Sequence, residues 1–274
     1  MDRLALRRPN SFKMKIEGRT FVVTGGASGL GRATVDMIVK NGGNAAILDL
    51  NEGLGNNAAS ELGSSVRFFL CDVTESDSIA KAVEGTVAWV KQSEKPLGGI
   101  IPAAGVGNPA TILNRHGDPF SLDHFDFVMN INVRGTVDTV RQFLQHLAKV
   151  DPSGPDNERG VVILVSSVAA FEGQKGQVAY GASKGAVMSM ALPMARDLSR
   201  YGIRVIAIAP GVFSSPMEGA MSEKVRAQLH RSAEFPGRPG LAPEFAQLVK
   251  HSIENIMLNG TVVRLDGAMR LGKL

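Results

Sequence analysis

The fold is best predicted from one stretch near the N-terminus, Phe21-Val22-Val23-Thr24-Gly25-Gly26-Ala27-Ser28-Gly29-Leu30-Gly31. A short apolar run leads into a glycine-rich turn, and a helix-like stretch, 32–40, follows. The three spaced glycines permit a tight turn, close approach of backbone to a ligand and close packing of helix on strand. A helix that begins there directs unpaired N–H groups and a positive dipole at its ligand. The pattern predicts a dinucleotide pyrophosphate site, although a glycine-rich hairpin is the alternative for this motif taken alone.

A carboxylate, Asp49, follows the glycine turn at the distance that is typical of a dinucleotide site. The next apolar run, 45–48, ends in Asp49, eighteen residues after Gly31. At this distance a carboxylate accepts hydrogen bonds from the adenosine ribose. No Lys or Arg stands at 50–52 to bind a 2′-phosphate. The sequence therefore predicts NAD as the cofactor, in preference to NADP.

A second motif lies in the C-terminal half, where Lys184 follows Tyr180 by four positions and Ser167 precedes Tyr180 by thirteen. Residues four apart share one face of a helix, so the Lys184 ammonium is expected to lower the pKa of the Tyr180 phenol. Such a tyrosine can exchange a proton with an alcohol near neutral pH. Ser167 follows the apolar run 161–165, which predicts a position at the C-terminal end of a buried strand. Taken alone, this motif is a weak signal, and the alternative is that Tyr180 is an ordinary surface helix residue.

Together the two motifs resemble the fingerprint of short-chain dehydrogenases/reductases, Thr-Gly-x-x-x-Gly-x-Gly followed by Ser and then Tyr-x-x-x-Lys. The resemblance extends from about Lys15 to the C-terminus. It implies that Asn132, Ser167, Tyr180 and Lys184 are catalytic, with Asn132 kinking a helix and holding a water beside the lysine. The motifs and the resemblance together give these cofactor-binding positions: Gly25, Ser28, Gly29, Leu30, Gly31, Asp49, Asp72, Val73, Ala103, Gly105, Tyr180, Lys184, Pro210, Val212, Phe213 and Ser215.

Within this family, three stretches and one insertion resemble the type-2 3-hydroxyacyl-CoA dehydrogenase subgroup, which also acts on some hydroxysteroids. They are residues 167–174, 210–216 and 258–268, and the long connection 105–122. The resemblance implies interconversion of (S)-3-hydroxyacyl-CoA and 3-ketoacyl-CoA in fatty acid metabolism, and assembly as a homotetramer. Two alternatives stay open: a ketoreductase acting on steroid-like or secondary-metabolite ketones, and a module that binds NAD without turnover. The complete catalytic set argues against the second.

The substrate is expected beside the catalytic residues. Ser167, Gln174, Gln177, Tyr180 and Phe213 are predicted to line its pocket, because they flank the nicotinamide segment or lie on the Ser167–Tyr180 connection. The segment 217–240 is interpreted either as a mobile substrate lid or as a plain surface helix. The phosphates of CoA would need cations outside the pocket, and the candidates are Lys175, Arg115, His230 and Arg231.

Two positions depart from the family pattern. Pro102 stands where the family usually has Asn, so the hydrogen bonds that normally tie that strand end must be replaced. Gly181 stands where Ser is common, at a cost of up to ~1 kcal/mol of helix stability relative to Ala. Neither change removes a catalytic atom.

Apolar runs alternate with helix-period segments along the chain, which predicts an α/β fold. We expect a single-domain, Rossmann-like, doubly wound parallel sheet with helices on both faces. Residues 1–14 are interpreted as a tail and 15–274 as the domain, with the NAD site in its N-terminal half and catalytic and substrate elements in its C-terminal half. A chain of 274 residues, 44% of them hydrophobic, can fill one such core.

Composition narrows the function classes further. A single cysteine, Cys71, excludes an intrachain disulfide and fits a reducing compartment. Aromatic residues make up only 5% and do not alternate with basic ones, so nucleic-acid binding is not expected. The five histidines show no metal-ligand spacing, and no apolar run is long enough to span a membrane. We expect a soluble intracellular protein. The sequences of its two ends do not distinguish between the cytoplasm, the mitochondrial matrix and the peroxisome as its location.

Overall fold

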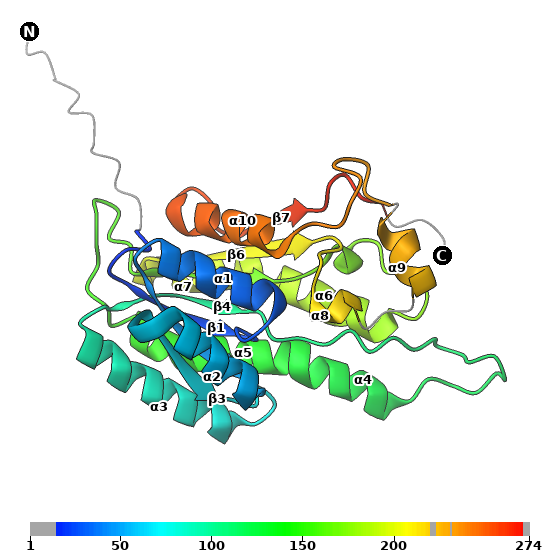
Figure 1. Ribbon diagram of the computed structural model, residues 1–274, viewed down its shortest axis with the longest axis horizontal. Coiled ribbons are helices and arrows are strands. Elements are labelled where there is room, and N and C mark those ends of the chain that lie inside the picture. The colour runs from blue at the N-terminus through cyan, green and yellow to red at the C-terminus, as the bar shows by residue number, and fades with distance from the viewer. Residues whose placement is uncertain (1–14, 220–222, 231, 271–274) are drawn as a thin grey trace, which may run out of the picture.

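The computed structural model describes residues 15–219, 223–230 and 232–270. These residues form one seven-stranded, fully parallel sheet in the order β3-β2-β1-β4-β5-β6-β7 (Figure 1). The strands are β1 (Thr20–Thr24), β2 (Asn44–Asp49), β3 (Val66–Leu70), β4 (Leu97–Pro102), β5 (Gly160–Val165), β6 (Ile203–Pro210) and β7 (Thr261–Leu265). The expected parallel sheet is thus confirmed, and the interpreted tail 1–14 lies outside the described residues.

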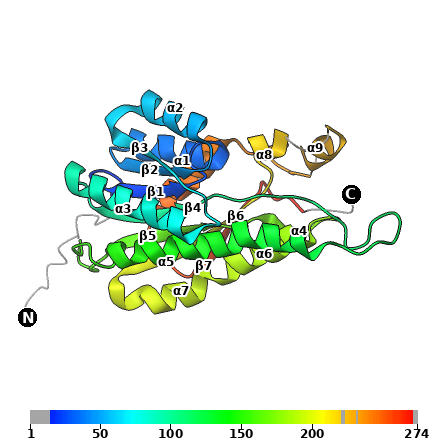
Figure 2. The same ribbon diagram turned by 90° about the horizontal axis from the view of Figure 1, so that it is seen from below.

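Helices connect the strands and cover both faces of the sheet. They are α1 (Gly29–Lys40), α2 (Glu52–Leu62), α3 (Ser76–Ser93), α4 (Leu122–Met129), α5 (Gly135–Leu147), α6 (Val178–Ser189), α7 (Ala191–Leu198), α8 (Pro216–Gly219), α9 (Glu223–His230) and α10 (Ala242–Glu254). Figure 2 shows α1 and α2 on one side of the strands and α3, α5 and α7 on the other.

Each face of the sheet has its own apolar core. The strands are apolar on both faces because helices bury both, as is usual for parallel sheets. On one face α1, α2 and α10 pack against alternate strand residues, with Phe21 and Phe245 fully buried. On the other face α3, α5, α6 and α7 do the same, with Phe143 and Leu147 fully buried.

The sheet order places a crevice at the carboxyl ends of β1 and β4. The chain winds outward from β1 through β2 to β3, then returns to the other side of β1 to build β4 to β7. Ligands of open parallel sheets bind where the winding reverses, outside the carboxyl ends of the strands. Both predicted motifs are at this edge, because the glycine turn follows β1 and Ser167 follows β5.

An arm formed by residues 105–121 extends from this edge, between β4 and α4 (Figures 1 and 2). It folds back at an isolated bridge between Leu113 and Pro119. A second bridge pairs Ala110 with Gln177, and the Ala110 N–H donates to the Gly176 carbonyl oxygen at 2.8 Å. The arm is therefore attached to the loop that precedes α6.

Candidate active site

A cavity of about 830 Å³ opens at the carboxyl ends of β1, β2, β4, β5 and β6. It runs from the glycine turn to α6 and is covered in part by α8 and α9. Its lining includes every predicted cofactor-binding position and every predicted substrate-pocket position. The two halves of the sequence prediction therefore meet in one continuous site.

The glycine turn is shaped for close approach of a ligand to backbone. Gly25 has a φ of +63°, and a Cβ there would lie 2.9 Å from the Ala104 Cα. A Cβ on Gly31 would overlap the carbonyl oxygen of Gly25. The Ser28 side chain makes no capping hydrogen bond, and the first turn of α1 carries no acidic residue. The N-terminus of α1 therefore presents its positive dipole to the cavity, which fits a pyrophosphate.

Two carboxylates, Asp49 and Asp72, border the end of the cavity at which the sequence predicts the adenosine. The Ala27 and Asn51 N–H groups donate to the two oxygens of Asp49 at 3.1 and 3.0 Å. These bonds fix the carboxylate and leave each oxygen able to accept another bond. Asp72 is fixed similarly by the N–H and hydroxyl of Thr74, at 2.8 and 2.7 Å. Among the described residues that line the cavity, Lys184 is the single Lys or Arg.

The strand end at Pro102 is tied by a residue that sequence reasoning missed. Thr24 accepts the Ala103 N–H on its carbonyl oxygen at 3.2 Å and the Ala104 N–H on its hydroxyl at 3.1 Å. Pro102 itself pairs with Thr24 as the last residue of β4. The hydroxyl of Thr24 thus ties the segment that follows Pro102. A threonine at the end of β1 was the available signal.

Ser167, Tyr180 and Lys184 come together at the centre of the cavity. Ser167 follows β5 and caps a short 3₁₀ turn (Val168–Ala170), where its hydroxyl accepts the Ala169 N–H at 3.1 Å. Tyr180 and Lys184 lie on the first turns of α6, and the Lys184 Nζ is 5.8 Å from the centroid of the Tyr180 ring. The same Nζ donates to the Val165 carbonyl oxygen at 3.0 Å. Serine and tyrosine are hydrogen-bonded to each other.

The pKa shifts of Tyr180 and Lys184 contradict one prediction made from the sequence. Burial raises the pKa of Tyr180, and its hydrogen bond with Ser167 opposes this increase only in part. Burial also lowers the pKa of Lys184 to about 8. We expected Lys184 to lower the pKa of the phenol, but the low-dielectric surroundings favour the neutral form of both groups. The Tyr180 phenol is therefore protonated near neutral pH.

Asn132 lies behind the cavity and not in its lining. It is buried in a π-helical turn (Asn130–Arg134) between α4 and α5, so the expected helix irregularity is present. Its side-chain oxygen accepts the Val106 N–H at 2.8 Å, and its amide donates to the Val106 carbonyl and the Ser183 hydroxyl at 3.0 and 2.9 Å. Asn132 thus fixes the base of the arm against α6. A water held beside Lys184 stays a prediction.

The substrate end of the cavity is largely apolar. Phe213 packs edge-on against Phe245, with ring centroids 6.2 Å apart. The Gln174 N–H donates to the Gln177 side-chain oxygen at 2.9 Å, so these two residues form one polar patch. Sequence reasoning missed two further apolar lining residues, Phe127 and Ile131. Their i, i+4 spacing just before Asn132 could have indicated them.

Described residues of the segment 217–240 border the cavity. Met217, Glu218 and Leu229 belong to the lining. The Glu218 carboxylate binds His230 across the two short helices, with Nε2 and Oε1 2.8 Å apart. These contacts place described parts of the segment at the cavity, and the choice between a mobile lid and a plain surface helix stays a prediction.

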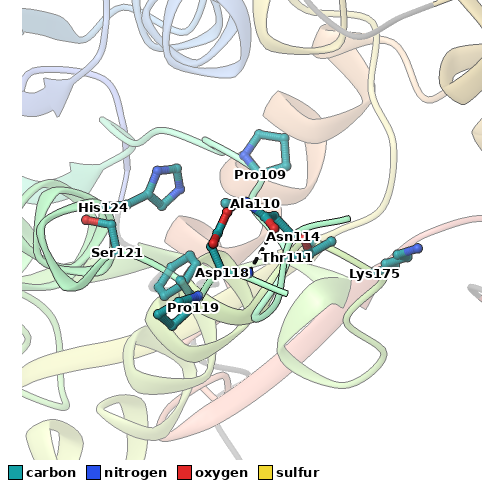
Figure 3. A pocket seen from close by; sticks show the side chains of 11 residues that line it. Pro109, Ala110, Thr111, Asn114, Asp118, Pro119, Ser121, His124 and Lys175 are labelled. Atoms are coloured by element: carbon teal, nitrogen blue, oxygen red, sulfur yellow. Dashed lines mark hydrogen bonds between the residues drawn. The ribbon is translucent and has the colours of Figure 1, made fainter. Parts of the chain in front are cut away.

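A second cavity, of about 620 Å³, lies between the arm and the loop before α6. In Figure 3, Lys175 lies on one side of it and His124 on the other, and Asn114 and Asp118 are hydrogen-bonded between them. Of the cations considered for CoA, only Lys175 lines either cavity within the described residues. Arg115 binds the neighbouring His116 instead, and Arg231 lies outside the described part of the chain.

The described residues contain no group of three or more His, Cys, Asp or Glu side chains that could hold a metal ion. In the same part of the chain, no helix has the length and apolar character needed to cross a membrane.

Comparisons with known proteins agree with this geometry. The family model of the short chain dehydrogenases matches residues 19–226. The chain is 42% identical to the 3-hydroxyacyl-CoA dehydrogenase type-2 of Drosophila melanogaster, over 93% of this chain and 99% of the relative. It is 40% identical to the human protein of the same name, over 93% and 97%. A crystal structure of 3-hydroxyacyl-CoA dehydrogenase type-2 from Mycobacterium avium superposes with a TM-score of 0.86, at 35% identity, over 96% of this chain and 100% of the other.

Proposed function

The chain belongs to the short-chain dehydrogenase family, and from this premise we propose that it is an NAD-dependent oxidoreductase that interconverts (S)-3-hydroxyacyl-CoA and 3-ketoacyl-CoA. The observation that carries the reaction type is the group of Ser167, Tyr180 and Lys184 in the cavity that begins at the glycine turn. The relatives named above support the substrate class, at about 40% identity over nearly the whole chain.

The chain's own residues account for binding and proton transfer. When bound, a nicotinamide cofactor supplies the hydride acceptor or donor for the carbinol carbon. The turn at Gly25–Gly31 and the start of α1 would hold its pyrophosphate, and Asp49 its adenosine ribose. Ser167 orients the substrate oxygen, and Tyr180 donates a proton to it in ketone reduction or accepts one in alcohol oxidation. Lys184 lies beside the phenol and adds positive charge when it is protonated.

NAD is preferred over NADP in this proposal. A 2′-phosphate would be placed against the fixed carboxylate of Asp49, and Lys184, the single basic side chain described in the lining, is at the catalytic end. Repulsion together with the lost hydrogen bonds is worth ~2 kcal/mol or more.

The phosphates of a CoA thioester would be bound outside the reaction cavity. Lys175 lines the second cavity, and Gln177 on the same loop lines the reaction cavity, so this loop borders both. We propose that this lysine pairs with a CoA phosphate. The pairing would make binding of the thioester depend on ionic strength.

A second candidate is favoured by the lining itself. Asp49, Asp72 and Glu218 are its acidic residues and Lys184 its one described base, while most other lining residues are apolar. This surface also suits an uncharged steroid-like or secondary-metabolite ketone. In either case we propose a homotetramer with two-fold axes, which the family resemblance implies and which the exposed apolar side chains of α4, α6 and α7 support.

One set of assays tests the proposal. NADH oxidation is measured with acetoacetyl-CoA, with longer 3-ketoacyl-CoA thioesters and with uncharged apolar ketones, at low and high salt. We expect turnover of the thioesters, with a KM that rises with salt while kcat changes little. Lys175→Met should raise KM for acetoacetyl-CoA and not for an uncharged ketone, whereas Lys81→Met on the exposed face of α3 should do neither. Turnover of uncharged ketones alone would favour the second candidate.

A further inference from the structure

Three segments that border the substrate end of the cavity meet at the turn that follows β7, residues 266–270. Met269 is buried and packs with Val168 and Val212, which both line the cavity. The Gly267 carbonyl oxygen accepts the N–H groups of Glu234 and Phe235 at 3.0 and 3.4 Å, at the end of the covering segment. Figure 1 shows the chain leaving β7 towards α9. The turn 266–270 therefore packs against residues that line the cavity, on the side away from the cavity.

Arg264, the fourth residue of β7, joins this turn to the loop 171–177. Its Nη1 is 2.7 Å from the Glu172 Oε1, and its Nε and Nη2 are 2.8 and 2.5 Å from the Asp266 Oδ2. Nη2 also donates to the Met269 carbonyl at 3.1 Å. The guanidinium lies over the Phe171 ring, 5.0 Å from its centroid. The Arg264 side chain thus contacts both the turn 266–270 and the loop 171–177.

Two arginines, Arg264 and Arg270, face two carboxylates, Glu172 and Asp266, so the charges balance. The two arginines are not equivalent. Arg270 approaches the same two carboxylates only at 3.6 and 3.5 Å, and its side chain is 67% exposed. The side chain of Arg264 is 24% exposed and makes the short contacts. Ion pairs are stronger when they are partly shielded from water, and an arginine fork holds two carboxylates in a defined geometry.

The loop that Arg264 holds contributes directly to the substrate pocket. Residues 171–177 connect the Ser167 turn to α6 and carry Gln174 and Gln177 into the cavity lining. The loop also binds the arm through Gly176. Fixing such a loop in advance reduces the conformational entropy that substrate binding would otherwise have to overcome.

We propose that Arg264 is a positioning residue for substrate recognition, which sets loop 171–177 through Glu172 and Phe171 and does not touch substrate or cofactor. The inference rests on the proposed dehydrogenase function for its kinetic readout. Because the loop borders the substrate end and not the adenosine end, Arg264 controls KM for the ketone substrate while leaving NADH affinity unchanged.

The test compares wild type with Arg264→Met, Glu172→Gln and a control. Lys250→Met is the control, because Lys250 is a partly buried base on α10 that pairs with Glu254 at 2.5 Å and lies outside both cavity linings. KM and kcat are measured with the best ketone substrate of the wild type, and the NADH dissociation constant by fluorescence titration. Hydrogen exchange of the amides of 171–178 is followed in the same four proteins, without substrate.

We expect Arg264→Met and Glu172→Gln to raise KM about tenfold, with kcat within about twofold and NADH binding unchanged. Exchange should become faster in 171–178 in both, and Lys250→Met should show neither effect. Unchanged KM and unchanged loop exchange in a folded Arg264→Met would overturn the proposal. Inactive wild type would instead count against the dehydrogenase function, and the exchange data would still decide whether Arg264 holds the loop.

Discussion

At the scale of single residues, burial sets the chemistry of the site more than the neighbouring charge does. Tyr180 has a raised pKa and Lys184 a pKa of about 8, both because of desolvation. A protonated phenol that is hydrogen-bonded to Ser167 is prepared to protonate a ketone. Ketone reduction should therefore lose rate as the pH rises, and alcohol oxidation should gain rate.

Replacing the phenol tests this assignment. Tyr180→Phe should lower kcat about 10³-fold, the usual size of a general acid–base contribution, while NADH binding is retained. The matched control is Tyr201→Phe, because the chain has only two tyrosines. Tyr201 lies on a 3₁₀ turn (Ser199–Tyr201) outside the described lining. Near wild-type turnover in Tyr180→Phe would remove Tyr180 from the mechanism.

The buried lysine should also affect stability in a pH-dependent way. The pKa of Lys184 in the folded protein, about 8, is below its ordinary value of 10.5, so the unfolded chain binds more protons between these two pH values. The penalty for burying the charged form is therefore complete below pH 8 and disappears as the pH rises towards 10.5. Its full size is about 3 kcal/mol, since each pKa unit corresponds to about 1.4 kcal/mol.

Urea unfolding of Lys184→Met and wild type at several pH values measures this effect. The stability of Lys184→Met relative to wild type should be greatest near pH 7 and should decline between pH 8 and 10.5. Lys81→Met, at an exposed position on α3, should show no such trend. A constant difference between Lys184→Met and wild type would mean that Lys184 is not desolvated.

The carboxylate of Asp49 should determine the preference for NAD over NADP. Wild type should use NAD with a kcat/KM about 30-fold or more above that with NADP, which corresponds to ~2 kcal/mol. Asp49→Ser should reduce this ratio by removing the charge that opposes a 2′-phosphate. Asp197→Ser, on the exposed face of α7, is the control. Equal use of both cofactors by wild type would show that the Asp49 carboxylate does not face the ribose.

The site residues could be predicted from sequence where a local motif defines them. The glycine turn, Ser167 and the Tyr180–Lys184 pair each follow from spacing along one segment. Thr24 binds the segment after Pro102, and Asn132 binds the arm, across large separations in sequence. The local sequence shows these polar residues but does not indicate their partners. The direction of the Tyr180 pKa shift was predicted wrongly because burial is a property of the packed site.

At the scale of secondary-structure elements, the end of α10 depends on a buried charge. Arg204 on β6 pairs with Glu158 at 2.6 Å and donates to the carbonyls of Ser252, Ile253 and Leu258 at 2.9, 2.6 and 3.0 Å. A helix leaves its last carbonyls without partners inside the helix, and a cation there also interacts favourably with the dipole. Arg204 thus fixes the C-terminal end of α10 and the chain that leads to β7.

Arg204→Met should therefore lower the free energy of unfolding by about 3–5 kcal/mol, because Glu158 would remain as an unpaired buried charge. Chemical denaturation measures the loss. The double variant Arg204→Met/Glu158→Gln should regain part of it, since the charge that lost its partner is removed. No recovery in the double variant would assign the loss to the helix carbonyls alone.

The elements themselves were predictable to different degrees. The apolar runs gave the strands because both faces of the sheet are covered, and the parallel order followed from strand–helix alternation. The arm and the covering segment 217–240 have no comparable periodicity. Their positions depend on long-range contacts, such as the Ala110–Gln177 bridge and the Glu218–His230 pair. For this reason the sequence alone did not distinguish a mobile lid from a plain surface helix at residues 217–240.

At the scale of the whole molecule, apolar side chains remain exposed along one side of the fold. Leu122 on α4, Val178 on α6 and Leu192 on α7 are 74%, 46% and 46% exposed. These three helices lie on the same side of the sheet (Figure 2). Exposed apolar surface that extends over several elements is typical of a protein interface. It supports the proposed homotetramer.

Light scattering with size exclusion tests this assembly. At micromolar concentration we expect a particle of four times the chain mass of 29.0 kDa. Leu192→Glu should dissociate it, because a charge would be buried in the interface without a partner. Leu54→Glu is the matched control, since Leu54 is equally exposed, at 46%, but lies on α2 on the other face of the sheet. A 29.0 kDa wild-type particle would contradict the tetramer, and an intact Leu192→Glu tetramer would move the interface away from this side.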